Sequence, residues 1–595
     1  MAVQSHDYPE SGVMKRGFVP TTAEGWERSG WLFFAVLAVV HLAIHAFSIM
    51  RGPDHVATAL FQDDTFYFLQ TAWNAHHFGF VTFDGINPTN GVQFLWWIVV
   101  WLIAWPLQSK AALVMGVAGV CAILNVAGYF VIYKIGRELE QPGLALSASV
   151  LWFSLTLASP TYIRGMDISL HGFVFWCVVW QLARFVVRHT LGQSPSLLPI
   201  TVVLILNVWT RIDSALVSGA IFGCCAALTL WDTKKLETTG SEPTTQARLK
   251  GVAIAAAFAA AGGLVQILAF RLMDRSVIPV SALWKSPRFL PSSHERFGDA
   301  FVSMIWRGFV DLGLPRVSLK PGMAAVVSVV LIFLMIWLCR RDTASRWTSP
   351  VAAVVLFVLG VVSLLGAWIP EMYLAVVGVL VILWLRWAES DSTKRSLFLT
   401  WATLTTAFLT YNAGAILLGM RPRYYSAWYQ APAHIFWIVT CWLAVYTVVV
   451  SARHHAVRRG FRIGGVALLG VVLVSGLVRG IRGYPPNAKF VGSLRMARGI
   501  AATETGGSIF AAWNAGLLGY YCERKLVNLD GLVNSVEYLK QREETDFRMI
   551  DYLHAENIEY VVDWTIPEEV RPYLTPISKS PTKPGWVPIV LYRVN

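Results

Sequence analysis

Long apolar runs of about twenty residues recur along most of this chain, and a helix needs about that length to cross a bilayer. Polar and charged residues fall mainly between these runs. We expect thirteen spans, at residues 31–50, 111–133, 143–162, 168–187, 196–211, 213–231, 251–271, 322–339, 349–368, 370–387, 396–418, 431–450 and 463–481. The pattern therefore predicts a polytopic α-helical membrane protein.

Basic residues are concentrated in alternate connections between these spans. The basic connections are 134–137, 184–188, 234–250, 340–346, 386–395 and 453–462. Because cytoplasmic loops carry an excess of Lys and Arg, we expect these connections and the N-terminal leader to lie in the cytoplasm. The other connections, and the tail after about residue 482, then face the outside of the plasma (inner) membrane.

One apolar segment does not fit this alternation. Residues 92–107 are hydrophobic but short and rich in Trp. If they crossed the bilayer, every later basic connection would move to the outside. We therefore predict a re-entrant or interfacial helix within the first outer loop, residues 51–110.

The tail has a different periodicity from the rest of the chain. Short apolar segments at 508–513, 525–529, 560–563 and 587–593 predict strands, and helical stretches at 515–521 and 545–556 lie between them. Strands that alternate with helices predict a small α/β domain with a mainly parallel sheet. We expect a transmembrane module over 1–482 and an extracytoplasmic domain over 483–595. The outer loop 272–321 is too long for a passive connector, so we expect it to line a site.

Composition agrees with a membrane protein and excludes some other classes. Mean hydropathy is +0.53 and charged residues make up 14% of the chain, against about a quarter in soluble domains. The net charge of +13 does not indicate a nucleic-acid partner, because the basic residues lie mainly in short loops. The cysteines form neither a zinc-binding spacing nor a disulfide framework.

The acidic pair Asp63-Asp64 lies about a dozen residues beyond the first span. Carboxylates beside a bilayer are costly and are usually retained for chemistry or ion handling. One of them could deprotonate an acceptor hydroxyl while its neighbour orients it or holds a divalent cation, Mg²⁺ or Mn²⁺. The alternative is a helix N-cap, since Asp63 precedes the helix-like run 65–77.

Three further charged residues interrupt apolar segments on the same predicted face. Asp167 stands where one span ends and the next begins, and it either helps to bind a metal or phosphate or caps the helix that starts at Ile168. Arg211 and Asp213 interrupt an apolar run of some thirty residues. They either pair across a helix break, or Arg211 faces an anionic ligand.

Candidate phosphate ligands follow later in the chain. Arg421, Arg423 and Tyr424 stand at the outer edge of a span, and guanidinium groups bind phosphate bidentately. Interface anchoring is the alternative, although Arg at an outer edge opposes the charge rule. Lys285 is a weaker candidate. The adjacent pairs His76-His77 and His454-His455 point apart on a helix and indicate surface residues rather than metal ligands.

Several short motifs together resemble a known family. Asp-Asp-x-Phe-Tyr-x-Leu-x-x-Ala at 63–72 and Thr-Phe-Asp-Gly-Ile-x-Pro-Thr-Asn-Gly at 82–91 are similar to the first outer loop of GT-C membrane glycosyltransferases. Short motifs then follow in the order of the bacterial members, at 165–167, 210–213, 279–281 and 423–424. Residues 516–535, with Asn-Leu-Asp-Gly at 528–531, resemble their outer C-terminal domain.

The resemblance implies a GT-C-like bundle of 13 spans that uses a polyprenyl-phosphate sugar donor, with a first-loop Asp as base. It implies inverting transfer to an extracytoplasmic glycan, lipid or protein acceptor. The chain departs from its bacterial relatives by having Gly-Met-Asp-Ile in place of Gly-Met-Glu-Thr, and Arg-Ile-Asp in place of Arg-Pro-Asp. The competing hypotheses are a lipid or glycolipid transporter or flippase, and a non-catalytic membrane binding protein. A transporter often shows internal repeats, which this sequence lacks.

Overall fold

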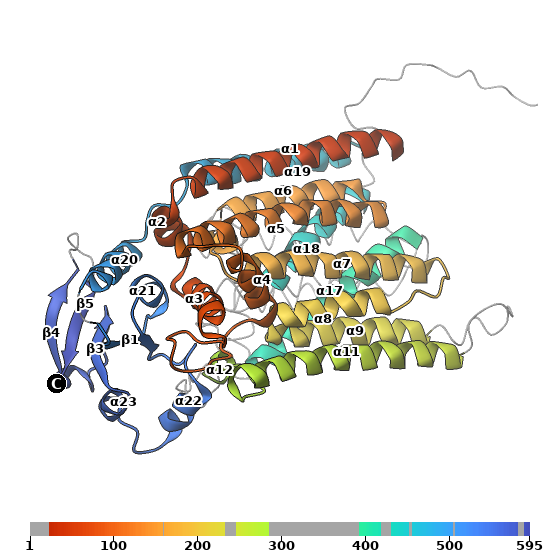
Figure 1. Cartoon of the computed structure of the whole chain (residues 1–595). Coiled ribbons are helices and arrows are strands. Elements are labelled where there is room, and N and C mark those ends of the chain that lie inside the picture. Colours follow the sequence, from red (N-terminus) through yellow and green to blue (C-terminus); the bar gives the residue numbers. More distant parts are fainter. Residues whose placement is uncertain are drawn as a thin grey trace, which may run out of the picture.

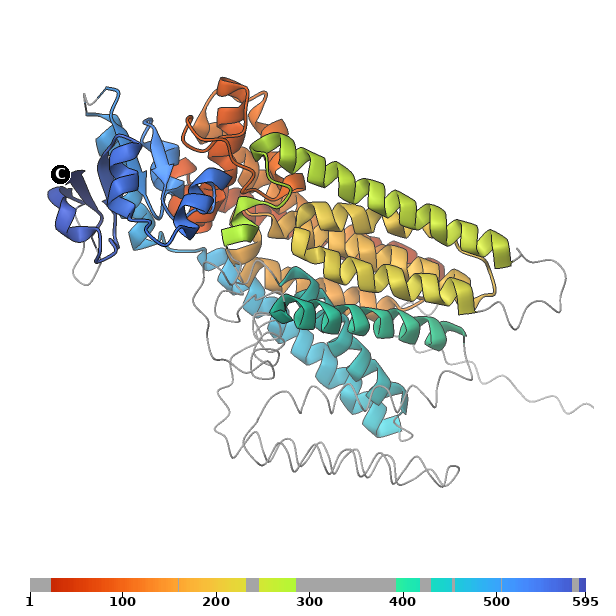
Figure 2. The ribbon, with the colours of Figure 1, turned by 90° about the horizontal axis from the view of Figure 1, so that it is seen from below.

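The computed structural model describes residues 23–158, 160–231, 245–284, 392–417, 430–451, 455–503, 506–580 and 588–595. Long helices lie side by side in a bundle, and a smaller domain made from the C-terminal part of the chain sits at one end of it (Figure 1). In the view turned by 90°, the same end of the bundle carries this domain and the short helices of the first outer loop (Figure 2). For brevity we call it the domain end.

Each predicted span that falls within the described residues coincides with a helix. The bundle helices are α1 (Ala23–Ile49), α5 (Lys110–Glu138), α6 (Pro142–Ala158), α7 (Ile168–Thr190), α8 (Leu198–Thr210), α9 (Ala215–Trp231), α11 (Thr245–Asp274), α17 (Ser392–Leu417), α18 (Ala431–Ser451) and α19 (His455–Arg482). Six described segments are long and apolar enough to cross a membrane, and four further apolar helices are shorter. The predicted spans 322–339, 349–368 and 370–387 lie outside the described residues.

The first outer loop stays at the domain end. After α1, the backbone oxygen of Thr58 accepts a hydrogen bond from Asn487, and Lys110 at the start of α5 donates to the backbone oxygen of Tyr520. The loop contains α2 (Pro53–His55), the π-helical turn Val56–Leu60, α3 (Asp63–Phe78) and α4 (Phe94–Ala104).

α4 covers the Trp-rich segment and is too short to cross. Its 11 residues span about 16 Å at 1.5 Å per residue, roughly half of the ~30 Å hydrocarbon thickness. The chain therefore enters and leaves 92–107 at the same end of the bundle, as the charge pattern predicts.

Small residues let bulky aromatic rings pack between the bundle helices. Trp152 of α6 is fully buried and donates from its indole nitrogen to the backbone oxygen of Asn125. A Cβ atom at Gly128 or at Gly172 would lie 2.8 Å from this indole ring. Glycine at these two positions therefore permits the close contact of α5, α6 and α7, a device common in membrane bundles.

The C-terminal domain is built on a five-stranded sheet with the order β2-β1-β3-β5-β4. Its strands are β1 (Ile509–Ala512), β2 (Leu526–Asn528), β3 (Ile558–Asp563), β4 (Leu574–Lys579) and β5 (Val590–Val594), and its helices are α20 (Ala488–Ala501), α21 (Gly516–Tyr521), α22 (Val536–Glu543) and α23 (Met549–Ala555). A small α/β domain is thus confirmed.

The sheet is mixed rather than mainly parallel. β1 pairs in parallel with β2 and β3, whereas β5 pairs antiparallel with both β3 and β4. The expectation of a mainly parallel sheet is therefore wrong for the β3–β5–β4 part of the sheet. There β5 runs antiparallel to its neighbours, and β4 was not predicted. All residues of β4 after Leu574 are exposed, so the strand has no alternation of apolar and polar residues that would reveal it.

The C-terminal domain and the first outer loop share one hydrophobic core. Leu517 and Tyr520 of α21 pack in the same cluster as Phe66 and Leu69 of α3. The backbones also approach closely, because a Cβ atom at Gly91 would lie 2.0 Å from the backbone oxygen of Leu532. The domain is therefore packed against the loop rather than tethered to it.

The alternation of helix directions generates a topology prediction. The α5–α6 connection lies at the end of the bundle away from the C-terminal domain, whereas α19 ends beside that domain (Figure 1). Reporter fusions after Pro142 and after Arg482 should report opposite sides of the membrane, with Pro142 inside. Reporters on the same side would refute both the orientation and the interfacial placement of 92–107.

Candidate active site

The acidic pair opens helix α3 but does not cap it. The N-cap of α3 is Gln62, which forms a capping box with Thr65, and Asp63 and Asp64 occupy the first turn. The hydroxyl of Thr65 donates to the backbone oxygen of Arg164, which joins this turn to the segment before α7. The alternative in which Asp63 is the N-cap of its own helix is therefore wrong.

Asp63 instead binds the C-terminal domain. Its carboxylate accepts hydrogen bonds from the backbone N–H groups of Gly516 at 3.1 Å and Leu517 at 2.9 Å, in the first turn of α21. A Cβ atom at position 516 would lie 2.0 Å from the backbone oxygen of Asp63. Only glycine therefore allows the two backbones to approach closely enough for these bonds.

Burial is the largest influence on the Asp63 carboxyl, and it raises the pKa to about 7. The two amides of α21 oppose this rise because they stabilise the charged form, while the neighbouring charge of Asp64 adds to it. A carboxyl group with a pKa near 7 is suited to accept a proton at physiological pH.

A third carboxylate approaches from the C-terminal domain. Asp530 accepts a hydrogen bond from Tyr67 of α3 at 3.2 Å, and Asn528 donates to the same tyrosine oxygen at 3.3 Å. Burial raises the pKa of Asp530 to about 7, and the charges of Asp64 and Asp63 also raise it. We call Asp63, Asp64 and Asp530 the carboxylate cluster.

Asp530 had not been singled out from the sequence, although its motif 528–531 had been. The signal that could have identified it is its position directly after a short buried strand. Because β1, β2 and β3 are parallel, the residues that follow them meet at one edge of the sheet, where ligands of α/β proteins commonly bind. Asp530 and the turn that begins at Trp513 both lie at this edge.

The second motif of the first outer loop, residues 82–91, forms a tight turn and contacts the 276–280 segment. Asp84 accepts hydrogen bonds from the backbone N–H groups of Ile86 and Asn87, each at 2.7 Å, which closes a tight turn. The side chain of Asn90 accepts from the Val280 N–H at 2.8 Å and donates to backbone oxygens of the 276–278 segment.

The outer loop 272–321 contributes to the same region, as far as it is described. Helix α12 (Val280–Trp284) packs against the core of the C-terminal domain. The guanidinium carbon of Arg542 lies 4.5 Å from the ring centroid of Trp284. Residues 285–321 lie outside the described part of the chain.

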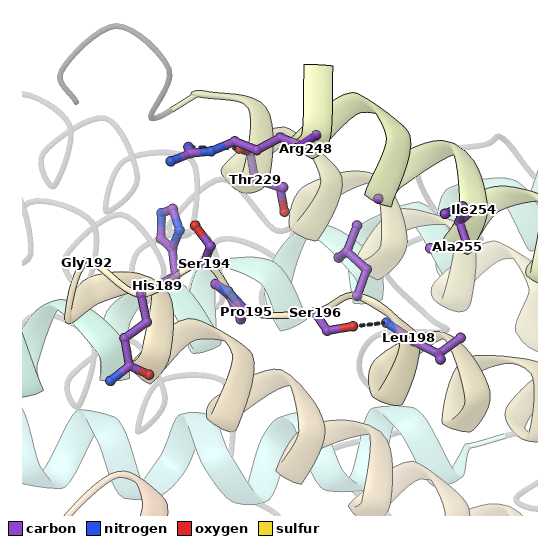
Figure 3. A pocket seen from close by; sticks show the side chains of 14 residues that line it. His189, Gly192, Ser194, Pro195, Ser196, Leu198, Thr229, Arg248, Ile254 and Ala255 are labelled. Atoms are coloured by element: carbon purple, nitrogen blue, oxygen red, sulfur yellow. Dashed lines mark hydrogen bonds between the residues drawn. The ribbon is translucent and has the colours of Figure 1, made fainter. Parts of the chain in front are cut away.

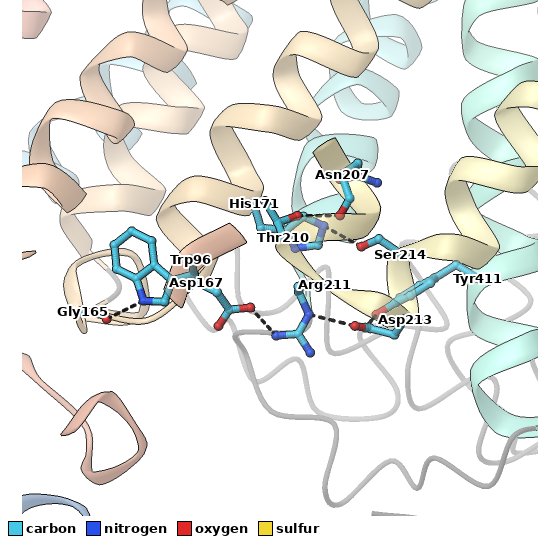
Figure 4. A network of polar contacts seen from close by, with 10 residues as sticks. All are labelled: Trp96, Gly165, Asp167, His171, Asn207, Thr210, Arg211, Asp213, Ser214 and Tyr411. Carbon is cyan, nitrogen blue, oxygen red and sulfur yellow. Dashed lines mark hydrogen bonds and ion pairs between the residues drawn. The ribbon is translucent and has the colours of Figure 1, made fainter. Parts of the chain in front are cut away.

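Arg211 is held between two carboxylates at the break between α8 and α9 (Figure 4). It donates to Asp167 at 2.6 Å and to Asp213 at 3.0 Å, and its side chain is only 2% exposed. Tyr411 of α17 donates to the other oxygen of Asp213 at 2.6 Å. The 3-10 turn Ile212–Ser214 separates the two helices, so of the two alternatives for these residues the structure shows the pair across a helix break.

Asp167 occupies the N-cap position of α7, but its side chain makes no capping bond. The capping alternative is therefore wrong, and its carboxylate pairs with Arg211 instead. Within the described residues, the second oxygen Oδ1 of Asp167 is buried and has no hydrogen-bond partner. The ion network thus joins α7, the α8–α9 break and α17.

The structure tests some of the remaining predictions. Arg421, Arg423, Tyr424 and Lys285 lie outside the described residues. His76 and His77 are exposed and stack on Trp101 and Trp73 respectively, as expected for surface residues. Within the described ranges, no group of three or more His, Cys, Asp or Glu side chains is arranged to hold a metal ion.

A cavity of about 390 Å³ opens far from this site. It lies between the end of α7, the α7–α8 connection, the end of α9 and the start of α11, with His189, Thr229, Arg248 and Ile254 in its wall (Figure 3). None of the predicted site residues lines it. The candidate site is therefore the carboxylate cluster and the Arg211 network, not this cavity.

Comparison with known sequences gives one match. Residues 484–590 match a family described as a domain of unknown function, DUF8728. This segment covers α20 and most of the sheet domain. No curated protein matches the chain.

Solved structures give similarities over most of the chain. A crystal structure of the Archaeoglobus fulgidus oligosaccharyltransferase in complex with Zn and sulfate is 12% identical, over 89% of this chain and 67% of that chain, with a TM-score of 0.46. ArnT from Cupriavidus metallidurans bound to undecaprenyl phosphate is 12% identical, over 96% of this chain and 98% of that chain, with a TM-score of 0.42. At these TM-scores the chemistry has to be argued from the residues of the site.

The Arg211 network generates a stability prediction. Replacing Arg211 with Met leaves two buried carboxylates without their counter-charge, which should cost about 3–5 kcal/mol of unfolding free energy. Denaturant titration of the detergent-solubilised protein would measure this loss. Arg548→Met is the control, because Arg548 pairs with Asp551 at the surface, where both side chains are more than half exposed. Equal stability of both variants would contradict the burial of the network.

Proposed function

We propose that this protein is an integral membrane glycosyltransferase that moves a sugar from a polyprenyl-phosphate donor to an extracytoplasmic glycan, lipid or protein. The observation that carries the proposal is the carboxylate cluster, which lies half-buried between the first outer loop and the C-terminal domain at the ends of the bundle helices. A carboxylate near pKa 7 at this place is a base within reach of a lipid-borne substrate.

The chemistry needs one base and one good leaving group. In the proposed step, a carboxylate oxygen of Asp63 takes the proton of an acceptor hydroxyl as its oxygen bonds to the anomeric carbon. The bond between that carbon and the phosphate oxygen breaks on the opposite face, and the lipid phosphate leaves with the electron pair. The anomeric configuration is therefore inverted, and Asp63 ends the step protonated.

Asp63 and Asp64 have different surroundings, which supports different roles. The carboxylate of Asp63 is oriented by two backbone amides, as a base must be to meet a substrate hydroxyl. The charge of Asp64 raises the pKa of Asp63. We assign proton abstraction to Asp63 and assign to Asp64 the tuning of that carboxyl and the orientation of the acceptor.

The donor phosphate requires cationic ligands. We propose that Arg421, Arg423 and Tyr424 bind it together with Lys285, since guanidinium forks match phosphate oxygens. Arg211 is a further candidate, but it would have to exchange one of its two carboxylate partners for the phosphate. Its ion pairs support a second role in fixing the α8–α9 break beside the site.

Among the described side chains, no group of three or more His, Cys, Asp or Glu is arranged to hold a divalent cation. Asp63 and Asp530 already accept hydrogen bonds from backbone N–H groups. The proposed step uses Asp63 as the base and the lipid phosphate as the leaving group. Asp167 and Asp213 are the secondary acidic residues that would supply oxygen ligands if Mg²⁺ or Mn²⁺ took part.

Substitution of the base tests the proposal. In assays of purified protein with a panel of radiolabelled polyprenyl-phosphate sugars, Asp63→Asn should lose about 10²–10⁴-fold in turnover, the usual contribution of a positioned base. Asp64→Asn should lose less, because Asp64 acts through its neighbour. Donor binding, measured with a non-transferable analogue, should persist in both variants.

Asp84→Asn is the matched control for this test. Asp84 is a buried carboxylate of the same loop that accepts hydrogen bonds only within its own turn. This variant should lose stability but keep most of its turnover. Near-wild-type turnover in both the Asp63 and the Asp64 variant would reject the base and favour the non-catalytic binding protein or the flippase.

The pH dependence gives an independent test. The base must be ionised, so kcat/KM should rise as the pH increases through about 7, the value to which burial raises the pKa of Asp63, and level off above it. Asp64→Asn removes a negative charge that raises this pKa, so the midpoint should move to lower pH. An unchanged or higher midpoint in that variant would contradict the assignment.

A further inference from the structure

The turn that leads to the amides of Gly516 and Leu517 is itself held by a buried carboxylate. Asp563, the last residue of β3, is 1% exposed. It accepts hydrogen bonds from the backbone N–H groups of Trp513 and Asn514, each at 2.9 Å, and from the Asn514 side chain at 3.0 Å. The N–H groups of Trp564 and Thr565 bind the same carboxylate at 2.7 and 3.2 Å.

This turn leads directly to the amides that hold Asp63. β1 and β3 are parallel neighbours, so the Asp563 carboxylate at the end of β3 lies beside the turn that leaves β1. Two residues beyond Asn514, the chain reaches Gly516 and then Leu517. The carboxylates of Asp563 and Asp63 therefore bind two adjacent parts of one backbone segment, at 513–514 and at 516–517.

The steric contact leaves little freedom in this arrangement. A Cβ atom at Gly516 would lie 2.0 Å from the backbone oxygen and 3.0 Å from the carboxyl carbon of Asp63. A second loop of the domain contacts the same helix, because Asp530 and Asn528 bind Tyr67 one turn further along α3. The first turn of α3 is thus held by the segments that follow β1 and β2.

We propose that the C-terminal domain completes the catalytic site, and that Asp563 is the positioning residue that holds the 513–515 turn so that the amides of Gly516 and Leu517, which follow this turn, orient Asp63. This inference rests on the proposed function, since it assumes that Asp63 is the base. It assigns to the domain a part in the chemistry.

Two effects of Asp563 on Asp63 oppose each other. The charged groups that face Asp63 are Asp64 on its own helix, Asp530 after β2 and Asp563 at the end of β3, with the Tyr67 hydroxyl nearby. The negative charge of Asp563 raises the pKa of Asp63, whereas the amides that it holds in place lower that pKa, and each amide has the larger effect. Losing Asp563 should therefore raise the pKa of Asp63.

The substitution Asp563→Asn tests the inference, with Asp551→Asn as the matched control. Asp551 is an exposed aspartate of the same domain, paired with Arg548. In Asp563→Asn, we expect kcat to fall about 10- to 100-fold from misplacement of the base, and the midpoint of the kcat/KM pH profile to move upward. A variant that only destabilises the domain would lower the yield of folded protein without moving the midpoint, and that outcome would overturn the inference.

A second readout does not depend on activity. Hydrogen exchange measured by mass spectrometry should show faster exchange of the peptide covering 513–521 in Asp63→Asn and in Asp563→Asn, but not in Asp551→Asn. If Asp563→Asn does not fold, Asn514→Ala removes only the side-chain bond to Asp563 and should show the same effects more weakly.

The two readouts separate the two proposals. A wild-type protein that transfers no sugar from any donor would refute the proposed function. Unchanged exchange of 513–521 in Asp63→Asn would instead overturn the positioning role, because it would mean that the carboxylate does not hold these amides in solution.

Discussion

The hydrogen bonds from Gly516 and Leu517 to Asp63 are the interaction on which the rest of the site depends. A half-buried carboxylate is partly withdrawn from water and needs hydrogen-bond donors, and here the donors come from another domain. The shared core of α3 and α21 brings the backbones together, and glycine at 516 allows the final approach. The first turn of α3 is thereby fixed, and Asp530 of the C-terminal domain binds Tyr67 one turn further along the same helix.

The helix bundle supplies a second fixed point at the same end. Arg211 binds Asp167 before α7 and Asp213 at the start of α9, and Tyr411 adds α17 to the network. Charged side chains are energetically costly inside a bilayer. These residues lie at helix ends and pair with one another, and both features reduce that cost. The carboxylate cluster and this network occupy one end of the bundle, while the large cavity lies elsewhere.

Much of the architecture could be predicted from the sequence because it depends on local patterns. Apolar length predicted the bundle helices that are described, and the interfacial placement of 92–107 stays a prediction from alternating charge. The Arg211–Asp213 pair was one of two alternatives that their spacing left open. The existence of β4 could not be predicted, since an exposed edge strand has no apolar pattern. The direction of β5 could not be predicted either, because its residues do not show in which direction it pairs with β3. The partners of Asp63 and the role of Asp530 depend on residues more than 400 positions apart, and no local pattern encodes such contacts.

The distance along the chain between Asp63 and its amide donors has a consequence for biosynthesis. The two groups are separated by 453 residues, which take roughly 20–90 s to synthesise at about 5–20 residues per second. During that interval the first outer loop has reached the membrane, but its acidic turn has no partner. The acidic turn is therefore completed only when the last segment of the chain has folded, so that a truncated or stalled product would lack the amides that order the Asp63 carboxylate.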